Sequence, residues 1–326
     1  MINPASYLGH ESQLYGTEEH RLVGGKGDGM RLLLVRSGGG LEFTLSLDRA
    51  ADISRLSYKG VNYGFFAPCG YVAPTYYDGQ GAGFLKSFTA GFLTTCGLRN
   101  VGSPCEDEGE ALPLHGTVSH IPAEQVNTWA DENNLYIRAT VRDAALFAHG
   151  LLLERTYTVP LLGNELTVTD RITNIGTTDT PLQMLYHFNM GYPLLDEHAI
   201  LRTSATEPPA PRNAHAAEGI ATACQMEPPQ RGYEEMCFYH KMEGRAEVSV
   251  FSPSVGRGLV MSYDTASLPY FTEWKMMGER DYVLGIEPGN TLPDGRDVMR
   301  TRGELEILRV GACKTHEIHF TFTEKQ

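Results

Sequence analysis

The chain has 326 residues, and its 27 basic and 40 acidic side chains give a net charge of −13 at pH 7. A negative field of this size repels phosphate backbones and anionic lipid, which excludes nucleic acid and membrane surfaces as preferred partners. Thirty-five glycines and eighteen prolines indicate many turns, and therefore many short strands rather than a few long helices.

Alternating apolar and polar residues predict β-strands along the whole chain. Residues 31–36 and 41–47 flank a turn of one serine and three glycines, which predicts a hairpin, and residues 151–159 and 165–172 predict a second one. Further strands are predicted at 134–141, 181–188, 247–251, 258–263, 282–286, 303–310 and 316–323. The sequence therefore predicts an all-β protein with large antiparallel sheets.

Helical signals are few. Residues 119–125, which Pro122 interrupts, and the very short segment 213–219 are the two candidates. Residues 207–235 are rich in Pro, Ala and Glu and are interpreted as a surface loop. Because similar strands occur on both sides of this loop, residues 1–326 are expected to form one domain, with residues 1–26 as an N-terminal extension packed on it.

The compartment is predicted from the N-terminus and the cysteines. No secretory signal is visible, and no stretch reaches the ~20 apolar residues of a membrane span. The six cysteines lack the spacing of a metal site, and Cys96 and Cys105 are expected to stay reduced although they are close in sequence. A cytoplasmic protein is therefore expected.

Three motifs suggest phosphate or metal binding, but the residues around each of them argue against that interpretation. The glycine-rich segment 24–29 precedes a predicted strand, whereas a phosphate-binding loop follows a strand and opens a helix. His316 and His319 point to opposite faces of a strand and cannot bind one ion together. The acidic cluster at 106–110 is interpreted as a solvated loop, so no metal site is predicted.

Ionisable side chains stand beside turn-forming residues in four short segments, at 96–100, 114–116, 186–191 and 285–290. Glu287 ends an apolar strand, where burial raises the pKa of a carboxyl group toward the range useful for a base. His187 lies among apolar residues and could act as the paired acid. Sites in β-sandwiches usually lie beside turns, so these segments are candidates for one site.

Each of these two residues also has a purely structural interpretation. Glu287 could be a rim carboxylate that pairs with Arg296 or Arg300, and His187 could be a core histidine bound to a backbone carbonyl. Periodicity and composition alone do not show that the four segments meet in space.

In chain order, Arg99-Asn100, His115-Gly116, His187 and Glu287-Pro288 resemble the signatures of the aldose 1-epimerase (galactose mutarotase-like) superfamily. The DUF4432, or YphB-like, branch of this superfamily is the closer likeness. Its pattern is similar to Asp48-Arg49 with Asp52-Ile53, to residues 94–102 and to Leu114-His115-Gly116 with Pro122-Ala123. The likeness spans the chain from about Gly27 to Phe322, and it implies a β-supersandwich with few short helices.

The resemblance also implies a reaction and roles for the residues. Glu287 would remove the proton of the anomeric hydroxyl of a monosaccharide, and His187 would protonate the ring oxygen. The ring then opens and closes again from its other face, while His115 and Arg99 hold hydroxyls and the migrating charge. This chemistry needs neither a metal nor a cofactor. His187 stands two residues from the position of the family's histidine, a shift that preserves the face of the strand.

The remaining expected substrate-binding residues are Asn100, Asn189, Trp274, Lys275 and Asp52. Asn189 shares the strand face of His187. Trp274 offers an indole surface for a sugar ring and Lys275 a cation for a hydroxyl or carboxylate, whereas a core anchor and a solvated charge are the structural alternatives. Asp52 could instead form a structural ion pair with Arg49.

The sequence thus favours an enzyme that interconverts the anomers of a free monosaccharide, and it leaves a homodimer open. A non-catalytic sugar-binding protein on the same fold is one alternative. An epimerase that acts on another carbon or on a modified sugar is another. A sugar phosphate is disfavoured, because Arg99 has no basic neighbour in sequence and the whole chain is acidic.

Overall fold

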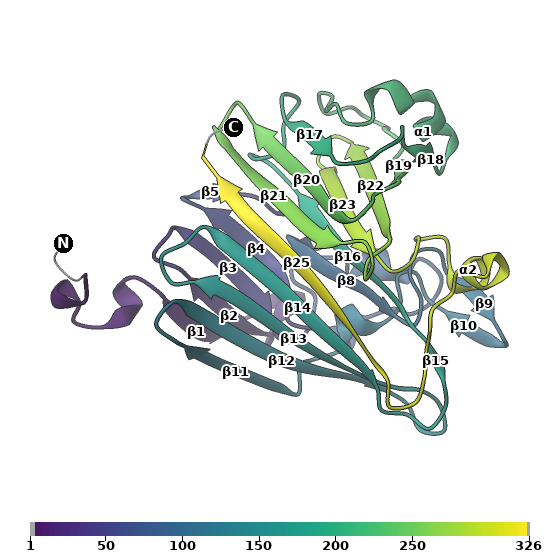
Figure 1. Cartoon of the computed structure of the whole chain (residues 1–326), viewed down its shortest axis with the longest axis horizontal. Helices are drawn as coiled ribbons and strands as arrows, with labels where there is room; N and C mark the ends of the chain where they lie inside the picture. The colour runs from purple at the N-terminus through teal and green to yellow at the C-terminus, as the bar shows by residue number, and fades with distance from the viewer. Residues whose placement is uncertain (1–3, 325–326) are drawn as a thin grey trace.

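The computed structural model describes residues 4–324 and is built mainly from three antiparallel sheets (Figure 1). The first sheet is a meander of β1 (Gly16–Arg21), β2 (Arg31–Arg36), β3 (Leu41–Ser46), β4 (Asp52–Tyr58) and β5 (Val61–Asn62). The first three and last two residues of the domain predicted at 1–326 lie outside the described residues, and the single-domain interpretation stays a prediction.

The largest sheet joins distant parts of the chain. Its order is β11 (Gln125–Ala130), β12 (Asn134–Ala144), β13 (Gly150–Pro160), β14 (Glu165–Asn174), β25 (Cys313–Thr323), β21 (Arg257–Asp264), β20 (Arg245–Ser252) and β17 (Ile200–Thr203). The C-terminal strand β25, yellow in Figure 1, is inserted between β14 and β21.

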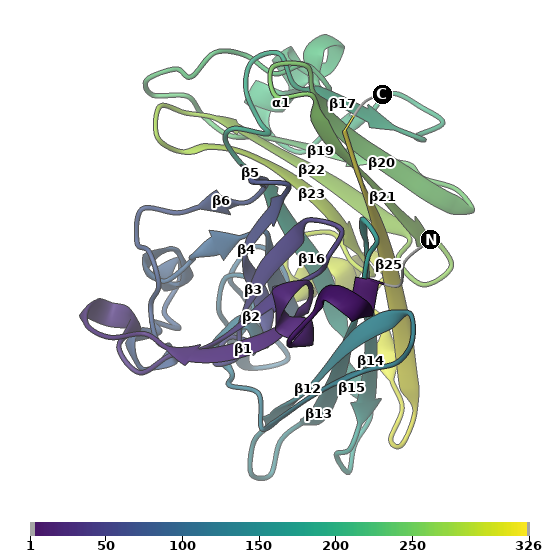
Figure 2. The ribbon, with the colours of Figure 1, turned by 90° about the vertical axis from the view of Figure 1, so that its left-hand side faces the viewer.

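The third sheet carries the candidate site. Its order is β18 (Ala210–Pro211), β19 (Met236–His240), β22 (Tyr270–Met277), β23 (Tyr282–Gly289), β16 (Gln183–Met190) and β8 (Leu93–Leu98). Figure 2, turned by 90°, shows β2–β4 on one side of the molecule and β20, β21 and β25 on the other.

Short elements connect the three sheets. Two-stranded ladders pair β6 (Phe65–Phe66) with β7 (Ala90–Gly91), β9 (Cys105–Asp107) with β10 (Glu110–Leu112), and β15 (Thr180–Pro181) with β24 (Ile307–Leu308). The α-helices are α1 (Ala214–Glu218) and α2 (Arg296–Arg302). Single 3-10 turns lie at Pro4–Tyr7, Glu11–Gln13, Gly25–Gly27, Pro74–Tyr76, Gly83–Lys86, Val118–His120 and Ile220–Thr222. Among the described residues, no helix is long and apolar enough to cross a bilayer.

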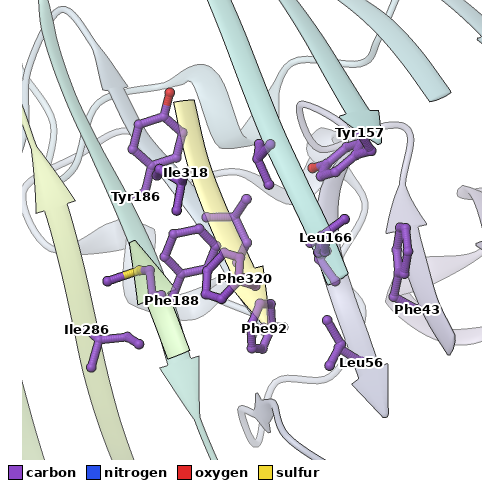
Figure 3. Packing of buried hydrophobic residues seen from close by; sticks show 14 of the residues in the cluster. Phe43, Leu56, Phe92, Tyr157, Leu166, Tyr186, Phe188, Ile286, Ile318 and Phe320 are labelled. Atoms are coloured by element: carbon purple, nitrogen blue, oxygen red, sulfur yellow. The ribbon is translucent and has the colours of Figure 1, made fainter. Parts of the chain in front are cut away.

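One hydrophobic core contains residues from all three sheets (Figure 3). Phe43 of β3 packs against Tyr157 of β13 with ring centroids 6.0 Å apart, and Phe188 of β16 packs against Phe320 of β25 at 4.8 Å. Each such buried side chain contributes roughly 1.5–3 kcal/mol, so the sheets are held together mainly by apolar burial.

The pleat of β16 separates the core from the site. Met184, Tyr186, Phe188 and Met190 belong to the core, so the alternate residues, including His187, point to the opposite face of the sheet. On β23, Leu284 and Ile286 are core residues, and the odd-numbered positions again face away. The side chains of His187 and Glu287 therefore both lie on the outer face of the six-stranded sheet.

The predicted hairpins are confirmed, with pairs such as Leu33 and Leu45 between β2 and β3, and Leu153 and Ile172 between β13 and β14. The strand predicted at 303–310 is wrong outside Ile307–Leu308. It follows helix α2, which the sequence did not reveal and which Gly303 ends at a φ of 74°.

Other local predictions are corrected by tertiary contacts. Residues 119–125 do not form an α-helix, and a 3-10 turn at Val118–His120 is followed by strand β11. Within the N-terminal extension, residues 16–21 pair with β2 and so form an edge strand of the sheet. Asp107 is buried rather than solvated, because it pairs with Arg296 and Arg300. All six cysteines are free thiols.

Candidate functional site

A cavity of about 360 Å³ lies on the outer face of the six-stranded sheet, within the roughly 300–1,000 Å³ of small-molecule sites. Adjacent strands supply its base with His187 from β16, Glu287 from β23, Trp274 from β22 and Cys237 from β19. The sheet thus brings together side chains that are up to 100 positions apart in the chain.

Glu287 and His187 form a buried pair in this cavity. Phe188 faces Ile286 across the antiparallel ladder of β16 and β23, a register that places residues 187 and 287 opposite each other. Glu287 Oε1 lies 3.2 Å from His187 Nε2, and both side chains are almost fully enclosed. The contact brings one carboxyl group and one imidazole to the same point of the cavity.

Burial sets the protonation of this pair. Desolvation raises the pKa of Glu287 well above its ordinary value, with a further increase from Glu235 and an opposing effect of Arg212. Desolvation lowers the pKa of His187 to about 4. Both shifts favour the uncharged arrangement of the pair, in which its proton is on Glu287 rather than on His187.

His115 supplies a hydrogen-bond donor to the same cavity. Its backbone has a φ of 57° and is held by Gly97 N, which donates to His115 O at 3.0 Å, and by Gly102 O, which accepts from His115 N at 2.9 Å. Gly102 N also donates to His115 Nδ1 at 3.3 Å. Since a backbone N–H can only donate, the neutral imidazole carries its proton on Nε2. Burial, followed by His187 and Arg212, lowers the pKa of His115 to about 3, which keeps the ring neutral.

Aromatic rings enclose the pair. Trp274 lies edge-on to His187 with centroids 5.2 Å apart, and Phe88 contacts His187 at 5.3 Å. Phe84 lies 5.2 Å from His115. The apolar C–H surface of a sugar ring packs well on such walls, while its hydroxyls need the polar groups between them.

The segment predicted as a surface loop also lines the cavity. Arg212 and Glu235 both come from residues 207–235, and sequence reasoning missed both. Neither residue follows a periodic pattern, so no local signal marks them. Phe84 and Phe88 were missed as well, although two phenylalanines four residues apart in a glycine-rich segment are a signal that could have drawn attention.

Of the predicted site residues, His115, His187, Trp274 and Glu287 line the cavity together. Asn189 is fully buried on the strand face of His187, and its Nδ2 donates to the His187 carbonyl at 2.8 Å. Asn189 thus supports the strand that carries the histidine.

The other predicted residues lie outside the cavity lining. Arg99 pairs with Glu110. Asn100 Nδ2 donates to Pro113 O at 2.8 Å, and its Oδ1 accepts from Arg296 N at 2.9 Å, so this side chain ties together the loops around it.

Lys275 and Asp52 are buried, and each forms an ion pair with a residue that does not line the cavity. Lys275 points to the opposite face of β22 from Trp274, and its Nζ lies 3.1 Å from Glu227 Oε1. Asp52 accepts hydrogen bonds from Arg155 Nη1 at 2.6 Å and from Thr95 N at 2.8 Å.

The structural alternative for Glu287 is not what the protein adopts. Arg296 and Arg300 bind Asp107 instead, and Glu287 contacts His187. Around this pair, the buried atoms without a hydrogen-bond partner among the described residues include Glu287 Oε1, His187 Nδ1, Asn189 Oδ1 and Thr272 Oγ1. Buried polar atoms are nearly always paired, so their concentration around Glu287 is typical of a place where a polar ligand binds.

Within residues 4–324, no group of three or more His, Cys, Asp and Glu side chains is arranged to hold a metal ion. The chemistry that the arrangement itself offers is transfer of a proton between Glu287, His187 and a polar ligand.

Comparison with protein families matches residues 27–322 to a family described as "Domain of unknown function (DUF4432)". No curated protein matches the sequence. Among solved structures, the chain is similar to a "putative aldose 1-epimerase" from Klebsiella pneumoniae subsp. pneumoniae MGH 78578, with 23% identity and a TM-score of 0.88. That match covers 96% of this chain and 88% of the other.

Two further solved structures show the same fold at lower identity. A galactose mutarotase-like protein from Clostridium acetobutylicum has 13% identity and a TM-score of 0.68, and the match covers 95% of this chain and 99% of the other. A galactose 1-epimerase from Lactobacillus acidophilus NCFM has 14% identity and a TM-score of 0.63, with 96% and 100% covered. The predicted galactose mutarotase-like β-supersandwich is therefore confirmed.

Proposed function

The chain belongs to the DUF4432 family, and from this membership, its fold and its cavity we propose that it is an isomerase that interconverts the anomers of a free monosaccharide. The observation that carries the proposal is the pair of Glu287 and His187, 3.2 Å apart in a cavity walled by aromatic rings. The proposal includes a cytoplasmic location and no cofactor.

The spacing of the pair suits the reaction. Mutarotation requires one group to take a proton from the anomeric hydroxyl and another to give a proton to the ring oxygen. These two oxygens are bonded to the same carbon, so the acid and the base must converge on neighbouring points. Glu287 Oε1 and His187 Nε2 do so from two adjacent strands.

The proton movements balance within the pair. Ring opening begins with the shared proton on His187. Glu287 takes the proton of the anomeric hydroxyl, the C1–O1 bond becomes a carbonyl, and the C1–O5 bond breaks as the ring oxygen receives the proton of His187. The open-chain state then coincides with the uncharged pair that burial favours. After rotation about C1–C2, the reverse transfers close the ring on the other face.

His115 would assist by donating from Nε2. Its neutral ring cannot supply a full charge, but an N–H fixed by the bond from Gly102 can stabilise an oxygen on which negative charge develops. Trp274 would carry the apolar face of the sugar. Acid–base catalysis of this kind supplies ~10²–10⁴-fold, which suits a reaction that already proceeds in water.

The test is exchange between anomer signals, measured by NMR over a panel of aldoses and ketoses. We expect at least one sugar to exchange faster with the protein, and Glu287→Gln to lower kcat/KM by ~10²–10⁴-fold. Glu165→Gln, the same substitution at an exposed residue of β14, is the matched control. Binding without faster exchange would instead identify a non-catalytic sugar-binding protein, and epimerisation at another carbon would appear as new signals.

A further inference from the structure

We propose that Arg212 and Glu235 form a second subsite of the cavity, which selects a neutral sugar by binding hydroxyls remote from the anomeric carbon. The inference rests on the proposed function for the direction of the sugar, with its anomeric end at Glu287 and His187. Both residues come from the irregular segment 207–235, and both line the cavity.

Arg212 is held in place by three acceptors. Its Nε donates to Asp294 Oδ1 at 3.2 Å, and its Nη2 donates to Ser103 Oγ at 3.1 Å and Pro293 O at 3.0 Å. No hydrogen bond from Arg212 Nη1 to another of the described residues is present. The guanidinium group is thus oriented by one edge and keeps donors for a ligand, as its rigid fork allows.

The main partner of Arg212 is itself fixed. Asp294 accepts a hydrogen bond from Tyr239 OH at 2.5 Å and one from Arg302 Nη1 at 2.8 Å. A carboxylate with three donors around it does not rotate freely, so Arg212 is positioned before a ligand arrives. Such preorganisation lowers the entropy cost of binding.

Glu235 is fixed to the aromatic wall. Its Oε2 accepts a hydrogen bond from Trp274 Nε1 at 2.7 Å, and the Trp274 ring contacts His187. The Trp274 ring therefore lies between the Glu235 carboxylate and the Glu287–His187 pair, and it contacts Glu235 and His187. A sugar that packs on Trp274 with its anomeric end at the pair brings its other hydroxyls toward Glu235.

Charge balance gives the class of substrate. Asp294 and Glu235 are offset by Arg212 and Arg302, so this end of the cavity has no net charge. The opposite effects of Arg212 and Glu235 on the pKa of Glu287 agree with this balance. A carboxylate accepts and a guanidinium donates, and adjacent hydroxyls can meet both. A uronic acid or a sugar phosphate would lose its hydration here without gaining an unpaired cation.

The experiment compares neutral and charged sugars on charge-altered variants. D-glucose, D-galactose and D-mannose are measured beside their uronic acids and 6-phosphates, with KM from NMR exchange and Kd from the fluorescence of Trp274 in a Trp129→Phe background. We expect the wild type to prefer a neutral sugar by at least about tenfold. Glu235→Gln and Arg212→Gln should each raise KM for that sugar about tenfold, and more than they change kcat.

The direction of the change in selectivity is the decisive readout. Glu235→Gln leaves an uncompensated cation, so the ratio of uronic acid to neutral sugar affinity should rise about tenfold, and Arg212→Gln should lower it. The double variant restores neutrality and should return the ratio to that of the wild type, with weak binding overall. Arg231→Gln and Glu279→Gln, which break an exposed ion pair beside the same segment, should change nothing.

Three results would overturn the subsite. These are a wild type that prefers a uronic acid or a 6-phosphate, single variants that leave the affinity for neutral sugars intact, and a ratio that does not move with charge. If no sugar exchanges faster but fluorescence shows the expected changes in affinity, the proposed reaction fails while the subsite stands. If exchange is fast and the ratios stay fixed, the reaction stands and the subsite fails.

Discussion

The carboxyl group of Glu287 occupies space that the missing side chain of Gly285 leaves open, two residues earlier on the same strand. A Cβ atom at position 285 would overlap Glu287 Oε1 and would lie 3.0 Å from Trp274 Cβ. The glycine therefore allows the carboxyl group to lie flat along β23 and reach His187. The lack of a side chain at Gly285 is therefore as necessary to this geometry as the carboxyl group of Glu287 and the imidazole of His187.

We expect Gly285→Ala to lower kcat of anomer exchange by about 10²-fold, because a displaced acid–base pair loses most of its ~10²–10⁴-fold contribution. The measurement is NMR exchange on the substrate identified with the wild type. Thermal unfolding serves as the control, since the variant must be folded at the assay temperature. Full activity in a folded Gly285→Ala protein would show that the observed position of the carboxyl group is not needed.

His115→Asn tests the donor at Nε2. An asparagine amide oxygen can replace Nδ1 as the acceptor for Gly102 N, and asparagine tolerates the φ of 57°, so the loop should keep its conformation. The Nε2 donor is lost, and kcat should fall by about 10²–10³-fold, the effect of removing a donor to a developing oxyanion. A variant with unchanged kcat and only a raised KM would assign His115 to binding alone.

The rate should depend on pH through the proton of the pair. As the pH falls through about 4, His187 gains a proton while Glu287 keeps its own, so no base remains and kcat/KM should fall. The raised pKa of Glu287 moves the loss of the pair's proton to higher pH, so the rate should stay flat above the acidic limb until Glu287 loses its proton.

This profile is measured by polarimetry, with spontaneous mutarotation subtracted at each pH. Circular dichroism at pH 4 controls for unfolding. An acidic limb near 6.5, the ordinary value for histidine, would contradict the buried, uncharged state of His187.

Asp52→Asn should act on stability rather than on KM. Its carboxylate is enclosed by Arg155 and Thr95, and breaking a buried ion pair by removing one partner costs about 3–5 kcal/mol. Arg155 keeps Asp170 as a second partner at 2.6 Å, so we expect a loss of about 3 kcal/mol, seen as a lower urea midpoint. A variant of normal stability with a raised KM would return Asp52 to the list of sugar-binding residues.

The all-β class could be predicted because strand periodicity is local, whereas the family resemblance implied the β-supersandwich. The hairpin at 31–47, for example, can be recognised from its alternating apolar and polar residues and its glycine-rich turn. No information about distant segments of the chain is needed. Helix α2 and the ladder at 307–308 could not be predicted in this way. The position of helix α2 depends on Asp107, which lies some 190 residues away and binds Arg296 and Arg300, and residues 307–308 pair with residues 180–181.

Part of the site could also be predicted. Glu287 and His187 stand out because each is an ionisable residue within an apolar strand, and the order of the motifs resembled a known family. The sequence predicted both Trp274 and Lys275 as substrate-binding residues, although adjacent residues of a strand point to opposite faces. The structure places Trp274 in the cavity lining.

The sequence by itself predicted the two hairpins, the faces of their strands, and Glu287 and His187 as candidate residues, because these depend on neighbours within a few positions. Only the tertiary structure decided which segments meet. Arg212 and Glu235 reach the cavity because β19 pairs with β22 and brings residues 207–235 over the sheet. Such a contact is set by pairing between distant strands, and no local pattern records it.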